Sequence, residues 1–76
     1  MKMKIVKLIW HDACDDEPWT NIKTLKPLVE VTTVGLLVRK TKEVVSVANS
    51  MYGSQVGGII HIPRGCVKSI EYLCEV

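Results

Sequence analysis

Several side chains in this 76-residue chain are suited to holding a small phosphorylated ligand. Arginine forms bidentate contacts with phosphate oxygens, and the backbone amides of glycine-rich turns can point at the same anion. Such turns occur at residues 53–58 and at Arg64-Gly65, and an aromatic ring can stack on a base. The predicted ligand-binding residues are Arg64, Tyr52, Asn49, Ser54, Trp19 and Arg39. The alternative interpretation is that these residues occupy ordinary turns.

Two His–Cys pairs have a spacing that could hold a metal. His11-x-x-Cys14 and His61-x4-Cys66 together supply two imidazoles and two thiols, which is a ligand set of tetrahedral zinc. No Cys-x-x-Cys pair accompanies them, and Cys66 fits a small core position equally well. We therefore predict no metal site and no other cofactor.

A run of acidic residues follows the first apolar segment and could support general acid–base chemistry. Asp12 and the sequence Asp15-Asp16-Glu17 lie beside His11, which could act as a base. Acidic runs are more typical of a solvated loop, however, and the chain has no phosphate-binding loop or glycine-rich nucleotide motif. A chain this short also has little room for a closed active site, so we predict that it is not an enzyme.

Nucleic acid is a further possible partner. Arg39, Lys40 and Lys42 cluster in the sequence, and Tyr52 and Trp19 could stack on bases. The formal net charge is only +2, and the acidic run interrupts any continuous basic track. Charged residues at a hairpin tip also discourage unwanted strand pairing. Nucleic-acid binding is therefore disfavoured but stays an alternative.

The composition predicts one small domain that covers residues 1–76. Apolar residues make up 47% of the chain, so it is not a disordered segment, and no apolar run is long enough to span a membrane. The N-terminal residues lack the pattern of a signal peptide. Three cysteines cannot all pair within one chain, which favours reduced thiols and a cytoplasmic location.

The apolar residues are rich in Val and Ile and predict an all-β fold. We expect five strands, at residues 4–13, 28–40, 43–49, 58–62 and 66–73. A long loop follows the first strand, with a short helical turn at residues 20–26 capped by Thr20 or Asn21. Gly35 should bend the long second strand, and the turn Pro63-Arg64-Gly65 precedes the last one. Residues 50–57 are expected to form a loop.

Two features bear on packing. Trp19 is expected to be buried, where it would hold the long loop against the sheet, although it could instead line the rim of a ligand site. The first strand is apolar on both faces, with Val6 and Leu8 on one and Ile5 and Ile9 on the other. Since one small domain has a single interior, we predict a symmetric homo-oligomer that covers the second face.

The sequence resembles two groups of proteins. The segment Ile60-x-Ile62-Pro63-x-Gly65-x-Val67-x-x-Ile70 is similar to the end of Sm-like small barrels, where a single turn separates the last two strands. The order Trp10-x-Asp12-Ala13, Val34-Gly35-x-Leu37 and Gly58-x-Ile60-x-Ile62-Pro63-x-Gly65-x-Val67 resembles a family of very short phage and prophage proteins. These resemblances imply a five-stranded Sm-like barrel without catalysis.

The phage resemblance implies a function of binding rather than chemistry. We predict a phage accessory protein in the cytoplasm of an infected bacterium, which binds and sequesters a small, anionic, nucleotide-type immune signal. Sequestration requires only affinity, so no catalytic group is needed. The alternatives are a protein-interaction module that docks on a host or phage protein, and a small barrel that binds RNA or DNA.

Overall fold

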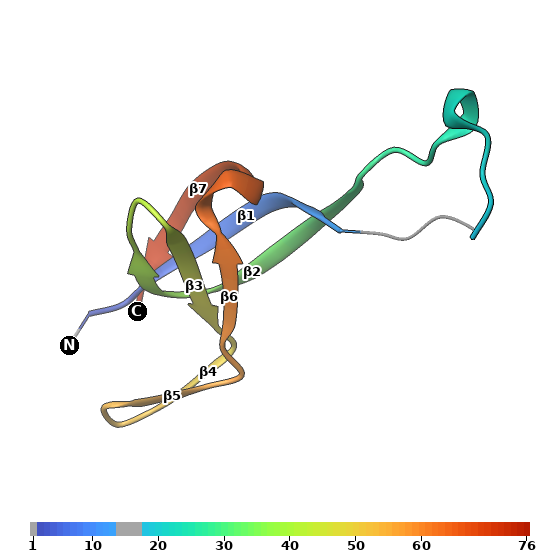
Figure 1. Ribbon diagram of the computed structural model, residues 1–76. Coiled ribbons are helices and arrows are strands. Elements are labelled where there is room, and N and C mark those ends of the chain that lie inside the picture. The colour runs from blue at the N-terminus through green and yellow to red at the C-terminus, as the bar shows by residue number, and fades with distance from the viewer. Residues whose placement is uncertain (1, 14–17) are drawn as a thin grey trace.

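The computed structural model describes residues 2–13 and 18–76 and has an all-β fold (Figure 1). Five strands form one antiparallel sheet in the order β6-β3-β2-β1-β7. Their bounds are β1 (Lys4–Asp12), β2 (Val29–Lys40), β3 (Val44–Ala48), β6 (Ile60–Pro63) and β7 (Val67–Glu75). A separate hairpin consists of β4 (Ser50–Tyr52) and β5 (Gln55–Gly57), and there are 3-10 turns at η1 (Ile22–Thr24) and η2 (Arg64–Cys66).

The core lies on one face of this sheet. Alternate residues of a strand point to opposite faces, so Val6 and Leu8 of β1 share a face and are fully buried. Three residues from the other half of the sheet complete the core cluster, namely Val45, Val47 and Ile62. Trp10 packs against this cluster, and its indole Nε1 donates to Thr33 Oγ1 at 2.9 Å. The branched residues of the sequence therefore pack across the two halves of one curled sheet.

The long second strand changes its pairing partner next to Gly35, where the sequence predicts a bend. Residues 29–36 of β2 pair with β1, whereas the pairing with β3 begins at Leu36. A Cβ atom at Gly35 would lie 2.5 Å from Val47 Cγ1 and 2.6 Å from the Ala48 carbonyl oxygen. Glycine is required here because two strands approach closely, not because of an unusual φ angle.

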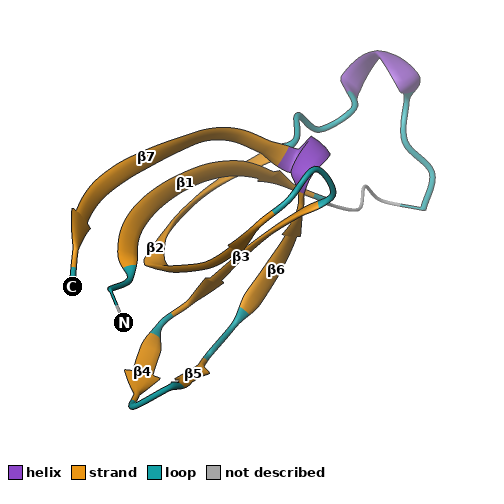
Figure 2. Cartoon of the chain, turned by 90° about the vertical axis from the view of Figure 1, so that its left-hand side faces the viewer, coloured by secondary structure: helices purple, strands orange, loops and turns teal. Residues whose placement is uncertain are grey.

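The sheet curls strongly but is not a closed barrel. Figure 2 shows β7, β1 and β2 curving over the shorter strands, and β6 and β7 are the two edges of the strand order. The turn η2 joins β6 to β7, as the Pro-Arg-Gly sequence predicted. The all-β, five-stranded sheet is thus confirmed, whereas the expected Sm-like closure is not seen.

Residues 50–57 form a β-hairpin rather than the predicted loop. Ser50 pairs with Gly57 and Tyr52 with Gln55, and Gly53 takes the left-handed φ of 60° at the turn. Each of the two strands is only three residues long, so most of this stretch has the glycines and serines that are typical of a loop. The sequence therefore predicts a loop here.

The segment 18–28 projects from the sheet as an arm (Figure 1). The molecule measures 51 × 20 × 19 Å, and its radius of gyration of 15.4 Å exceeds the roughly 11 Å expected for a compact chain of this length. The predicted short helical turn is confirmed as η1, where Asn21 Oδ1 accepts from the Lys23 backbone N at 2.9 Å. We refer to residues 18–28 as the arm.

The prediction that Trp19 is buried is wrong. Its side chain is 95% exposed, and it does not hold the arm against the sheet. The physical reason is the direction of the strands, because β1 ends and β2 begins at the end of the sheet from which the arm projects (Figure 1). Among residues 2–13 and 18–76, Trp19 therefore has no apolar surface to pack on.

Candidate anion-binding site

Two lysine side chains approach Tyr72 on β7. Lys40 Nζ donates to Tyr72 Oη at 3.1 Å and lies 5.5 Å from the ring centroid. Lys4 Nζ lies 5.2 Å from the same centroid, within the range of a cation–π contact. We refer to Tyr72, Lys4 and Lys40 as the tyrosine cluster.

The curl of the sheet brings these three residues together. Lys4 begins β1 and Lys40 ends β2, while Tyr72 is the register partner of the buried Val6. A bulge opposite Ile5 and Val6 leaves Leu73 unpaired and aligns Tyr72 with Val6, on the core face. Tyr72 is 49% exposed, so the ring stands at the edge of the core and is accessible to solvent.

The electrostatics of the cluster favour negative charge. The hydrogen bond from Lys40 lowers the pKa of the Tyr72 phenol below its ordinary value of 10.0. Partial desolvation acts in the opposite direction, and the charges of Lys40, Lys4 and Arg64 lower the pKa further. Cations that stabilise a phenolate stabilise a bound anion by the same physics.

Arg64 is the one predicted site residue that acts on this cluster. It lies in η2, where its backbone N donates to the Glu43 carbonyl oxygen at 2.8 Å. Its Nη1 atom is buried and has no hydrogen-bond partner among the described residues. A buried donor without an acceptor is costly, and an anion is the natural acceptor for a guanidinium.

A shallow pocket of about 190 Å³ adjoins Tyr72. Its lining residues are Lys4, Tyr72, Leu73, Cys74 and Glu75. The pocket is open to solvent, so it can admit a phosphate group while the rest of a larger ligand stays outside it. The Glu75 carboxylate offsets part of the positive charge, so a ligand must draw on both lysines and the phenol at once.

Arg39 has a different environment. Its Nη2 atom lies 3.3 Å from Ser46 Oγ and 3.4 Å from His61 Nδ1, and Ser46 Oγ lies 2.6 Å from that same nitrogen. A serine beside a histidine can act as a nucleophile, but Ser46 is completely buried. The contacts instead satisfy a buried hydroxyl in β3, which is a structural role.

Asn49, Tyr52 and Ser54 belong to the β4–β5 hairpin. Asn49 Oδ1 accepts from Ser50 Oγ at 2.8 Å, and its side chain fills the space where a Cβ of Gly58 would lie. Tyr52 is 87% exposed and lines a hollow of about 240 Å³. Lysine and arginine are absent from the residues that line this hollow, so its wall has no cation to attract an anion.

The six predicted ligand-binding residues thus do not form one site. Arg64 acts on the tyrosine cluster, Arg39 contacts Ser46, three residues lie at the hairpin and Trp19 lies on the arm. The sequence analysis missed Lys4 and Tyr72 because they are 68 positions apart. It noted Lys40 only as part of a basic hairpin, and no local motif links these three.

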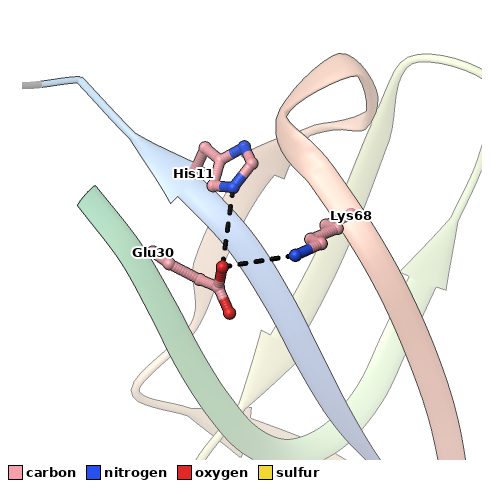
Figure 3. A network of polar contacts seen from close by, with 3 residues as sticks. All are labelled: His11, Glu30 and Lys68. Carbon is pink, nitrogen blue, oxygen red and sulfur yellow. Dashed lines mark hydrogen bonds and ion pairs between the residues drawn. The ribbon is translucent and has the colours of Figure 1, made fainter. Parts of the chain in front are cut away.

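His11 takes part in a surface network, not in a recognisable metal site (Figure 3). Its Nε2 atom lies 3.9 Å from Glu30 Oε2, and Lys68 Nζ lies 3.4 Å from that same oxygen. Across residues 2–13 and 18–76, no three His, Cys, Asp or Glu side chains converge. Cys14 and the acidic residues 15–17 lie outside the described residues.

Comparisons with known proteins add no assignment. No protein-family model, curated protein or solved structure matches this chain. Within the described residues, no helix is long and apolar enough to cross a membrane.

Proposed function

We propose that this protein binds a small anionic, nucleotide-like ligand at the tyrosine cluster without catalysing a reaction. The main supporting observation is that Lys4 and Lys40, from the start of β1 and the end of β2, both approach Tyr72. These two positions lie at the same end of the antiparallel pair. The unpartnered Nη1 of Arg64 lies in a residue close enough to influence the same phenol. No other described surface combines several cations with an aromatic ring.

The chemistry of the cluster favours a phosphate group over a single carboxylate. The two ammonium groups and the Tyr72 hydroxyl supply separate donors, which a tetrahedral anion can engage together. Each lysine is exposed, so one contact alone competes poorly with water. A ligand with two phosphates, or a phosphate and a base, gains from several weak contacts at once.

The narrower role follows from the resemblance to short phage proteins and stays a prediction. In that role the protein sequesters a nucleotide-type immune signal in the cytoplasm of an infected bacterium. Sequestration requires affinity but no catalysis. A site made of hydrogen-bond donors and one aromatic ring agrees with this requirement. Nucleic-acid binding stays an alternative that the same experiment addresses.

A backbone-amide NMR titration tests the proposal, with pyrophosphate, ADP-ribose, a cyclic dinucleotide and a short oligonucleotide as probes. We expect shifts centred on residues 4, 40 and 72, and a roughly fivefold or larger loss of affinity in Lys40→Gln. The control is Lys42→Gln, which removes the same charge two residues away. Equal losses in both variants, or no shift around Tyr72, would contradict a specific site. A preference for the oligonucleotide would favour the nucleic-acid alternative.

A protein-interaction role is the second candidate. The observation in its favour is the arm, whose four largest apolar side chains are more than half exposed. These residues are Trp19, Ile22, Leu25 and Leu28. The arm and the tyrosine cluster are separate surfaces, so the two candidates can be tested independently.

A further inference from the structure

The apolar residues of the arm recur at every third position. They are Trp19, Ile22, Leu25 and Leu28, with exposed fractions of 95%, 81%, 58% and 63%. The backbone at Asn21 (φ −67°, ψ 128°) and at Leu25 (φ −63°, ψ 145°) is close to polyproline II, which has three residues per turn. The intervening η1 turn also has three residues per turn. This period predicts one apolar ridge along the arm.

A groove of matching character lies on the outer face of the sheet. It has a volume of about 420 Å³, and apolar residues predominate in its lining. Ile5, Val34, Leu36, Met51 and Val76 are the large apolar residues of that lining. Val34 is 56% exposed and Met51 is 42% exposed. Ile5 alternates with the buried Val6, so the groove lies on the second apolar face of β1, near the start of that strand.

The ridge and the groove of one chain cannot meet. The groove contains Ile5 near the start of β1, and the arm leaves the sheet beyond Asp12 at its end. Seven residues of strand separate them by about 23 Å. In two copies related by a two-fold axis, with their β1 strands antiparallel, each ridge lies over the groove of the other copy.

The exposed area agrees with a surface of dimer size. The chain exposes 5845 Å², whereas a compact monomer of 8.5 kDa exposes about 4,650 Å². The excess of about 1,200 Å² is more than the roughly 800 Å² that each partner buries in a standard interface. Edge pairing through β7 is disfavoured, since that strand carries bulges at Lys68 and Leu73.

We propose that two copies of this chain form a symmetric dimer, in which the arm ridge of each copy occupies the outer groove of the other. The contact is isologous and closed, because each copy gives one ridge and receives one. It covers both the exposed arm and the second apolar face of β1. The tyrosine cluster is not part of this contact and stays free to bind its ligand.

Light scattering coupled to gel filtration tests the dimer over a range of micromolar concentrations. We expect a mass of twice 8.5 kDa for the natural sequence. The double variant Trp19→Ser/Ile22→Ser and the groove variant Val34→Glu should each weaken dimerisation by about a hundredfold or more. Tyr52→Ser is the matched control for an exposed aromatic outside the ridge. Val38→Glu is the control for a charge placed elsewhere on β2.

Mixing the two disrupted variants provides the decisive measurement. The arm variant keeps an intact groove and the groove variant keeps an intact ridge, so an equal mixture should recover a heterodimer with one native contact. Circular dichroism checks that both variants fold, and their substitutions leave the buried core cluster unchanged. A monomeric natural protein would overturn the proposal and assign the arm to another partner. A dimer insensitive to both variants, or no recovery in the mixture, would equally overturn it.

Discussion

The sheet and the arm contain similar apolar residues but differ in how far these side chains are buried. Leu8 in β1 is completely buried, whereas Leu25 in the arm is 58% exposed. Leu8 lies in a strand that pairs on both sides, and its face of the sheet is covered by β3 and β6. Leu25 lies in a segment between Pro18 and Pro27 that has no strand partner.

Hydrophobicity alone therefore does not bury a residue. A side chain is buried when its element is held against a second apolar layer, and the arm has no such layer within its own chain. The sheet therefore stabilises the fold, while the apolar side chains of the arm stay exposed in the single chain.

The largest effect is expected from truncating the two leucines. Leu8→Ala removes buried methyl groups and leaves a cavity, so the free energy of unfolding should fall by about 3 kcal/mol. Leu25→Ala should change it by less than about 0.5 kcal/mol, because the side chain is already in water. Chemical denaturation of dilute, monomeric protein measures both values. Similar losses in the two variants would show that the arm packs on the sheet.

A second contrast concerns two glycines. Gly35→Val should lower the free energy of unfolding by about 2–3 kcal/mol, since the new Cβ would overlap Val47 Cγ1 and the Ala48 carbonyl oxygen. Gly57→Val should be tolerated within about 0.5 kcal/mol, because no atom lies within 4 Å of the added Cβ. Thermal and chemical denaturation should agree on this order. An undisturbed Gly35→Val protein would refute the close approach of β2 and β3.

A smaller effect is expected from one hydrogen bond within the sheet, between Trp10 of β1 and Thr33 of β2. Thr33→Val keeps the shape of the side chain but removes the acceptor for Trp10 Nε1. The free energy of unfolding should fall by about 1 kcal/mol, the net value of one partly buried hydrogen bond. The Trp10 indole N–H resonance should also move in the NMR spectrum. Thr32→Val, at an exposed neighbouring position, is the control, and an equal effect there would argue against the bond.

The smallest effect concerns the protonation of Tyr72. In a Tyr52→Phe background, ultraviolet absorbance should show Tyr72 ionising below the ordinary pKa of 10.0. Lys40→Gln should raise this pKa, because the hydrogen bond from Lys40 is the largest cause of the lowering. The pKa of Tyr72 is lower in the folded than in the unfolded protein, so the Tyr72 phenolate raises the free energy of unfolding only in alkaline solution. This gain is lost as the pH falls through the pKa of the folded protein. A pKa unchanged by Lys40→Gln would remove the electrostatic argument for the cluster.

Binding of an anion should show the opposite pH dependence. A neutral Tyr72 hydroxyl can donate to a phosphate, whereas the phenolate cannot donate and repels it. Affinity should therefore decline as the pH rises through the Tyr72 pKa, and Tyr72→Phe should abolish that decline. Persistence of the decline in Tyr72→Phe would assign it to another titrating group.

The sequence by itself determined the local features of this fold. The Val- and Ile-rich segments specified the five main strands, because branched side chains favour the pleated sheet at those positions. Gly35 marked the bend, Asn21 marked the cap of the short turn, and Pro63-Arg64-Gly65 marked the turn before β7. Each of these features depends on backbone preferences of neighbouring residues, which a sequence records directly.

Only the tertiary structure decided what lies together in space. The curl of the sheet, a sum of strand twist, a glycine bend and bulges, brings Lys4, Lys40 and Tyr72 into contact. The same geometry leaves Trp19 exposed, although its residue type favours burial. Such outcomes depend on where a strand points after many residues, so small local angles accumulate beyond what residue types and spacing can specify.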